Sequence, residues 1–340
     1  MFIFLYICLN KTTKNMKKLL NYASILFIVL TITTFTSCND DDNNDPIIPV
    51  SNTIADFVVA NSSNYSSLLA ALQQADLVTT LSGTDNFTVF APDNAAFSKF
   101  LSDNGFASLE DVPTDILKQV LLNHVISGVV KSTDLSTGYV STLSTATPNM
   151  ENINMFVNTT GGVMLNGISS VTNADNMVDN GVIHLVNEVI ALPTVVTFAV
   201  ADPTFSILVS ALTRDDQPDF VSTLSTADGT SPAPFTVFAP TNDAFADLLT
   251  ELDAMSLDDV GTATLTATLN HHVVAGANVV ASSLTDNMMV TTLGGDITAN
   301  VTGGATLTDA NNRVSNIIVT DVQASNGIIH VIDKVVLPPL

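Results

Sequence analysis

The feature that most constrains the fold of this chain is an eleven-residue stretch that occurs twice. Residues 87–97 have the sequence FTVFAPDNAAF and residues 235–245 have FTVFAPTNDAF, so the copies differ at only two positions after a shift of 148 residues. In each copy a β-prone run ends at a proline, which cannot donate to a sheet ladder, and a residue suited to an N-cap follows. The stretch therefore predicts a strand that turns directly into a helix. Its framework residues are Phe87, Pro92 and Phe97 in the first copy and Phe235, Pro240 and Phe245 in the second.

Two further blocks repeat in the same order. Residues 123–125 (Asn-His-Val) correspond to residues 271–273 (His-His-Val) at the same shift of 148. Residues 181–190 (GVIHLVNEVI) correspond to residues 327–336 (GIIHVIDKVV) at a shift of 146. Agreement of the shift at three places indicates duplication of a whole domain, since repeats at a fixed period mark repeated structural units.

The duplication divides the chain into a first domain over residues 51–194 and a second over residues 195–340, with 195–202 as a short linker. In each domain the helical spacing of apolar residues comes first, and short Val/Ile/Thr-rich runs separated by turn residues follow. This order predicts an α+β fold. We expect helices at 66–81, 95–101, 114–123, 205–212 and 241–252, strands at 155–158, 163–165, 168–172 and 181–190, and hairpin turns at Gly161-Gly162 and Gly303-Gly304.

The repeated blocks, with their central His-Val step and closing Leu-Pro, resemble the signature blocks of fasciclin-like domains. The resemblance covers nearly all of the chain after residue 50, and it implies two tandem domains, each a wedge-shaped β-sandwich with a packed helical layer. Members of that family are adhesion and matrix modules rather than enzymes. In some members a Tyr-His pair near the middle block takes part in adhesion. The matching positions here, and hence the candidate adhesion region, are Asn123, His124, His271 and His272, where the tyrosine is absent.

The first 37 residues have the pattern of a secretory signal. They carry four of the ten basic residues, no acid and an apolar run from Leu19 to Leu30, which closes on small residues before Cys38. Met16, directly before Lys17-Lys18, is the more natural start than Met1. The residues before Cys38 resemble a bacterial lipobox, so we expect Cys38 to be lipidated; an ordinary signal peptide and an uncleaved membrane helix are the alternatives.

An acidic tether, residues 38–50, follows the signal. It resembles the export tag of surface lipoproteins of the Bacteroidetes, and by composition alone it is a solvated spacer. Without residues 1–37 the chain keeps six basic residues against 33 acids, a formal charge of −27. A nucleic-acid partner is not expected, because a phosphate backbone would be repelled.

The histidines are the residues most suggestive of chemistry. His184 and His330 alternate with branched apolar residues, which favours core histidines bonded to backbone over metal ligands. His124, His271 and His272 lie where a helix meets a strand, which favours capping or packing over ligation. Each domain has too few His and Cys for a zinc site. The acidic pairs Glu110-Asp111, Asp215-Asp216 and Asp258-Asp259 are interpreted as solvated surface, so we expect no catalytic residue, metal or cofactor.

The sequence therefore predicts a cell-surface, outer-membrane lipoprotein that mediates protein–protein or cell–matrix contact and is not an enzyme. Its expected partners are the membrane, through lipid on Cys38, a protein or glycan ligand, and weakly a second copy of itself. The alternative is a glycan-binding accessory lipoprotein of a nutrient importer. The chain has no Trp and four Tyr, which argues against an aromatic sugar platform.

Overall fold

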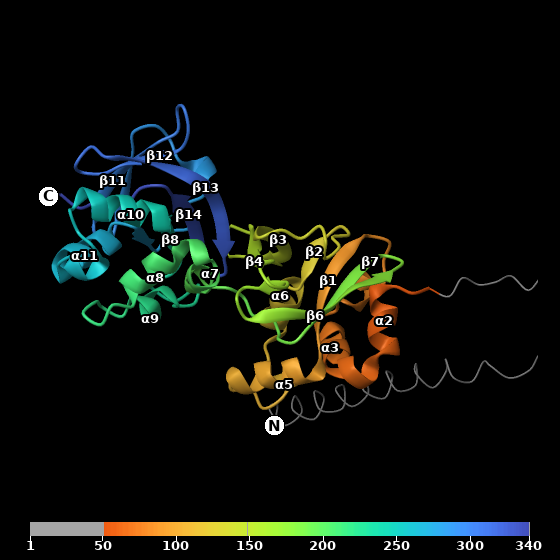
Figure 1. Cartoon of the computed structure of the whole chain (residues 1–340). Helices are drawn as coiled ribbons and strands as arrows, with labels where there is room; N and C mark the ends of the chain where they lie inside the picture. The colour runs from red at the N-terminus through yellow and green to blue at the C-terminus, as the bar shows by residue number, and fades with distance from the viewer. Residues whose placement is uncertain (1–50, 148, 340) are drawn as a thin grey trace, which may run out of the picture. The chain divides into compact units, whose positions relative to one another are not determined.

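The computed structural model describes residues 51–147 and 149–339, and within Ser51–Leu340 it forms one compact unit. This unit contains the same arrangement of helices and strands twice (Figure 1). Each copy has a group of helices on a seven-stranded sheet, so the predicted α+β class is confirmed. The predicted signal, Cys38 and the acidic tether lie outside the described residues.

The helical part of the first copy precedes and surrounds strand β1. Its helices are α2 (Ile54–Ala60), α3 (Ser62–Gln74), α4 (Val78–Leu81), α5 (Asn94–Asp103), η1 (Leu109–Asp111) and α6 (Thr114–Leu122). Its strands are β1 (Phe87–Pro92), β2 (Val125–Ser127), β3 (Gly138–Thr145), β4 (Asn152–Asn158), β5 (Met164–Leu165), β6 (Ser169–Val178) and β7 (Gly181–Val186).

The second copy follows the same order. Its helices are α7 (Val195–Ala201), η2 (Pro203–Phe205), α8 (Ser206–Leu212), α9 (Phe220–Leu224), α10 (Asn242–Glu251), η3 (Leu257–Asp259), α11 (Thr262–Asn270) and η4 (Ala281–Ser283). Its strands are β8 (Phe235–Pro240), β9 (Val273–Ala275), β10 (Met288–Thr292), β11 (Gly295–Asn300), β12 (Thr306–Thr308), β13 (Val314–Ala324) and β14 (Gly327–Ile332).

The two sheets have the same topology. The strand order is β2-β1-β7-β6-β5-β4-β3 in the first and β9-β8-β14-β13-β12-β11-β10 in the second. The only parallel pairs among the described strands are β1 with β7 and β8 with β14; the remaining neighbours are antiparallel. The repeated stretch and the repeated G-x-I-H block are therefore adjacent strands, although about ninety residues separate them in the chain.

The strand-to-helix joint is built as the sequence predicts. β1 and β8 are buried along their whole lengths and end at the proline. The side chain of Asp93 caps α5 by accepting the Ala96 N–H, and that of Thr241 caps α10 by accepting the Ala244 N–H. Each cap satisfies an N–H that the first helical turn leaves without a partner.

Each copy buries apolar side chains on both faces of its sheet. The core under the helices of the first copy includes Ile54, Leu72, Phe97 and Leu117. The core on the other face of the sheet is formed by side chains of the strands and includes Phe90 and Met155. The second copy has the same two cores. A sheet buried on both faces explains why β1, β7, β8 and β14 are nearly continuous apolar runs.

Two predictions about the helices were wrong. The helix expected over 66–81 is broken into α3 and α4, because Asp76 adopts a left-handed backbone with φ of 56°. The Leu77 N–H then bonds to the Leu72 carbonyl and closes α3 with a Schellman turn. The linker expected at 195–202 is largely helix α7, whose buried Val195 and Phe198 belong to the core of the second copy.

Among the described residues no single helix is long and apolar enough to cross a membrane. Only α7 together with Pro203–Leu212 reaches that length and composition, as a pair bent by 93°.

Candidate functional site

The first candidate site is the joint between the two repeated blocks. Phe87 pairs with Gly181 and Phe90 with His184 in the parallel register of β1 and β7. A Cβ on Gly181 would lie 2.0 Å from the Phe87 carbonyl oxygen, so only glycine fits at this position. Close backbone contact and side-chain packing fill the joint. It exposes no described group suited to nucleophilic or acid–base chemistry.

His184 and His330 are core residues, as predicted. Both are fully buried. Nδ1 of His184 accepts the Asp175 N–H at 3.2 Å, and Nε2 lies 3.0 Å from the Val130 carbonyl oxygen. His330 makes the equivalent bonds to Asp321 and Val279 at 3.3 and 2.8 Å. One ring nitrogen accepts and the other donates, so each ring is the neutral tautomer and has no lone pair left for a metal.

His124 and His272 are also buried and bonded to backbone on both sides. Nδ1 of His124 donates to the Val120 carbonyl at 2.7 Å, and Nε2 accepts the Ile190 N–H at 2.8 Å. His272 bonds in the same way to Thr268 and Val336. Burial lowers the pKa of each imidazole to about 4, because a charged ring would lose its hydration.

The neighbouring residues of the predicted adhesion region are buried as well. Nδ2 of Asn123 donates to the carbonyls of Ile190 and Ala191, both at 3.1 Å. His271 lies 3.0 Å from the Ala267 carbonyl and packs against the loop at Gly294. Since all four side chains are at most 3% exposed, direct contact with a partner does not agree with the folded structure. The packing interpretation of Asn123, His124, His271 and His272 replaces it.

The acidic pairs lie at the surface. Asp111 and Asp259 close capping boxes of η1 and η3, and Asp216 pairs with Arg214 at 2.6 Å. The Arg214 side chain lowers the pKa of Asp216 below its usual range. Over residues 51–147 and 149–339 no three His, Cys, Asp or Glu side chains are placed to hold one metal ion.

Two buried asparagines went unnoticed in the sequence. Oδ1 of Asn180 accepts the Ile54 N–H, and its Nδ2 donates to the carbonyls of Leu81 and Gly83. Asn326 makes the same three bonds in the second copy, to Val195, Leu224 and Thr226. Each side chain ties the first helix of its domain to the loop before the repeated strand. Both asparagines directly precede the glycine of the G-x-I-H block. This repeated Asn-Gly pair is the sequence pattern that could have identified them.

The two copies share an apolar contact around Tyr139 of β3. Its ring packs on Phe156 of β4 at 5.0 Å and edge-on to Phe198 of α7 at 5.3 Å. Its hydroxyl donates to Asp202 Oδ2 at 3.0 Å. Phe156 is 2% exposed and lies in the core cluster of the second copy, so that core is completed by a side chain of the first.

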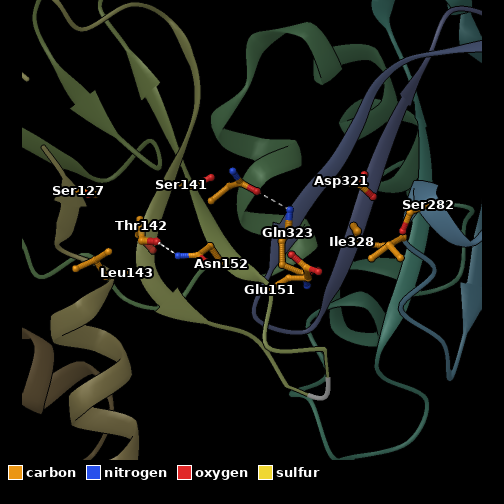
Figure 2. Close-up of a pocket in the computed structure, with 12 residues that line it drawn as sticks. Ser127, Ser141, Thr142, Leu143, Glu151, Asn152, Ser282, Asp321, Gln323 and Ile328 are labelled. Carbon is orange, nitrogen blue, oxygen red and sulfur yellow. Dashed lines mark hydrogen bonds between the residues drawn. The ribbon is translucent and has the colours of Figure 1, made fainter.

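A polar cleft lined by strands of both copies is a further candidate binding site (Figure 2). Its volume is about 470 Å³, and strands β2, β3 and β4 supply one wall while η4, β13 and β14 supply the other. The Gln323 N–H donates to Asn154 Oδ1 at 2.7 Å and joins the two walls. The sequence offered no signal for this cleft, because its residues are scattered over about two hundred positions.

Comparison with known proteins identifies the domains. The family model described as Fasciclin domain matches residues 63–193 and again residues 203–338. The chain belongs to the fasciclin family. Both copies are matched separately, in agreement with the duplicated topology.

Several individual proteins are similar to parts of this fasciclin protein. Protein sll1483 of Synechocystis sp. is 39% identical over 147 residues, which is 43% of this chain and 74% of that protein. Cell surface glycolipoprotein MPB83 of Mycobacterium bovis is 34% identical over 147 residues, 43% of this chain and 60% of that protein. A solved FAS1 domain pair from the insect cell adhesion molecule fasciclin I aligns with a TM-score of 0.46 and 19% identity, covering 79% of this chain and 92% of that one.

Proposed function

We propose that this protein is a lipid-anchored adhesion protein of the cell envelope, in which two fasciclin domains mediate contact with a protein or with matrix. The observation that carries the proposal is the fasciclin match over both domains, since fasciclin domains are frequent in adhesion proteins. The buried histidines described above argue against a catalytic function for these residues.

Anchoring is supported by the sequence before residue 51 and by one relative. The basic and apolar segment that ends at Cys38 has the order of a lipoprotein signal. The similar Mycobacterium bovis protein carries the words cell surface glycolipoprotein in its name. A lipid on Cys38 would hold the protein, and the acidic tether would separate the domains from the membrane.

The shared contact around Tyr139 and Phe156 supports joint use of the two domains. Because the second core includes a first-domain side chain, the pair presents its surfaces at a fixed spacing. Many such pairs on one cell convert weak individual contacts into strong attachment through high effective concentration.

Adhesion is tested with beads that carry the purified protein. Coated beads are expected to adhere to one another, to matrix proteins or to matrix glycans more than beads coated with an equally acidic protein without fasciclin domains. Equal adherence of the two kinds of bead in every pairing contradicts the adhesion proposal.

Anchoring has an independent test. In cells, Cys38→Ala should move the protein from the membrane fraction to the soluble fraction, with Ser37→Ala as the matched control. A Cys38→Ala protein that stays in the membrane fraction at the unmodified level contradicts lipidation.

A further inference from the structure

The polar cleft between β3, β4 and β13 contains side-chain groups that the folded chain does not use. Ser127 and Ser141 lie on the first wall, together with Glu151, and Ser282 lies on the second (Figure 2). None of these four side chains hydrogen-bonds to a described residue, and all four are exposed. Nδ2 of Asn154 is likewise without a described partner, while its Oδ1 is held by Gln323.

The chemistry of these groups differs from that of a common small-molecule pocket. Sites of about 300–1,000 Å³ are usually lined mostly by apolar and aromatic side chains. Most residues that line this cleft of about 470 Å³ carry hydroxyl, amide or carboxylate groups, and Leu143, Val280 and Ile328 are its apolar members. Hydroxyls and amides both donate and accept, so they match a ligand rich in hydroxyl groups.

The charge of the cleft selects against anions. Glu151 and Asp321 contribute two carboxylates, and no Lys, Arg or His is among the lining residues. An anionic ligand would therefore enter a negative site on a strongly acidic chain. A neutral ligand avoids this repulsion and can still donate its hydroxyls to the carboxylates.

Parts of the lining are held in place before any ligand arrives. Gln323 is 2% exposed, and its Nε2 donates to the Gly327 carbonyl at 2.9 Å while its Oε1 accepts from Asn278 at 2.9 Å. Asp321 Oδ1 accepts the Ala281 N–H at 2.8 Å, which restrains this carboxylate. Fixed polar groups lose little conformational freedom when a ligand binds.

We propose that this cleft binds a neutral sugar residue, as part of a glycan on the surface to which the protein attaches. The inference rests on the proposed adhesion function and gives it a ligand chemistry. Residues of both domains contact the sugar, so the tandem pair, rather than a single domain, is the binding unit.

The test measures binding of three sugars of one shape and different charge to the purified protein by saturation-transfer NMR and titration calorimetry. The probes are glucose, glucuronate and glucosamine, with galactose, mannose and their disaccharides as further neutral members. At least one neutral sugar is expected to bind, and glucuronate is expected to bind about tenfold more weakly than glucose if glucose binds. Binding of glucosamine alone identifies a cation site and overturns the proposal, as does the absence of binding by every neutral sugar.

Two variants locate the binding. Glu151→Ala and Ser282→Ala change exposed side chains on opposite walls, and each should weaken the neutral sugar about fivefold or more. Glu110→Ala, on the exposed η1 turn, is the matched control and should leave the affinity unchanged. If a sugar binds with equal affinity to all variants, the cleft is not its site.

Failure of this inference and failure of the adhesion proposal give different results. Suppose that no sugar binds and that beads coated with the Glu151→Ala protein adhere as strongly as unmodified beads. The proposal of a sugar site in the cleft is then wrong, and the adhesion proposal stands. If beads coated with the unmodified protein adhere no better than the control beads, the adhesion proposal is wrong. The sugar titration then still measures whether the cleft binds a neutral sugar.

Discussion

The ring of Phe90 stacks on the imidazole of His184, with centroids 5.4 Å apart and planes inclined by 29°. Phe238 stacks on His330 in the second domain at 5.7 Å and 25°. Each pair joins the first repeated block to the last across the parallel register of β1 with β7 or β8 with β14. The blocks that identify the family in sequence are thus one packed unit in space.

The packing of this unit predicts a large loss of stability when its histidine is replaced. His184→Ala removes the stacked ring and leaves the Asp175 N–H and the Val130 carbonyl without their partner. We expect the free energy of unfolding to fall by about 2–4 kcal/mol, from the cavity and the unpaired polar groups. Urea unfolding followed by circular dichroism measures the loss, with exposed Glu110→Ala as the control. A change equal to that of the control contradicts the structural role.

The two histidines at the helix–strand junctions predict a loss of stability in mild acid. The pKa of His124 and His272 is about 4 in the folded state and about 6.5 in an unfolded chain. Between these values the unfolded state binds more protons, so stability falls as the pH decreases from about 6.5 towards 4. At pH 5 the loss is ~2 kcal/mol for each histidine.

A variant that cannot titrate isolates this effect. His124→Gln should be less stable than the unmodified protein at pH 7, because it loses buried bonds, yet its stability should change less between pH 7 and pH 5. The measurement is the urea midpoint at each pH. Identical pH dependence of the two proteins contradicts the lowered pKa of His124.

The close approach at the parallel pair predicts a position restricted to glycine. A Cβ on Gly327 would lie 2.3 Å from the Phe235 carbonyl oxygen, whereas a Cβ on Gly261 would meet nothing within 4 Å. Gly327→Ala should lower stability by about 3 kcal/mol, because β8 and β14 must move apart. Gly261→Ala is the matched control and should leave the stability nearly unchanged. Thermal unfolding measures the melting temperature of both variants. Equal melting temperatures of the two variants contradict the close packing.

The contact between the domains predicts a pH-dependent contribution from Tyr139. Tyr139→Phe removes the hydrogen bond to Asp202 and should lower stability by about 1–2 kcal/mol at pH 7. Burial and the adjacent Asp202 raise the pKa of the Tyr139 hydroxyl, so the folded protein keeps it protonated where the unfolded chain begins to ionise. The difference between the two proteins should therefore shrink above about pH 10. A difference that stays constant to pH 11 contradicts this assignment.

Local sequence patterns predicted the repeated elements well. The strand-to-helix joint was predicted from apolar runs with helical or alternating spacing and from the Pro-Asp and Pro-Thr pairs. This was possible because helix capping and the effect of proline act over a few residues. The same reasoning missed the break at Asp76 and assigned α7 to a linker. A left-handed aspartate and a short helix that is held by Asn326 leave only weak signals in the local sequence.

The sequence alone determined the duplication, the α+β class and the family, because each depends on which residues repeat and in what order. The tertiary structure decided what those residues do. Asn123, His124, His271 and His272 became interior side chains, since their bonding partners lie up to 68 positions away in the chain. The polar cleft arises only when β4 and β13 come together, because no local pattern encodes a contact between strands about 170 residues apart. The repeated stretch at residues 87–97 thus fixes the scaffold, and the spatial pairing of the two domains creates the surface on which binding is proposed.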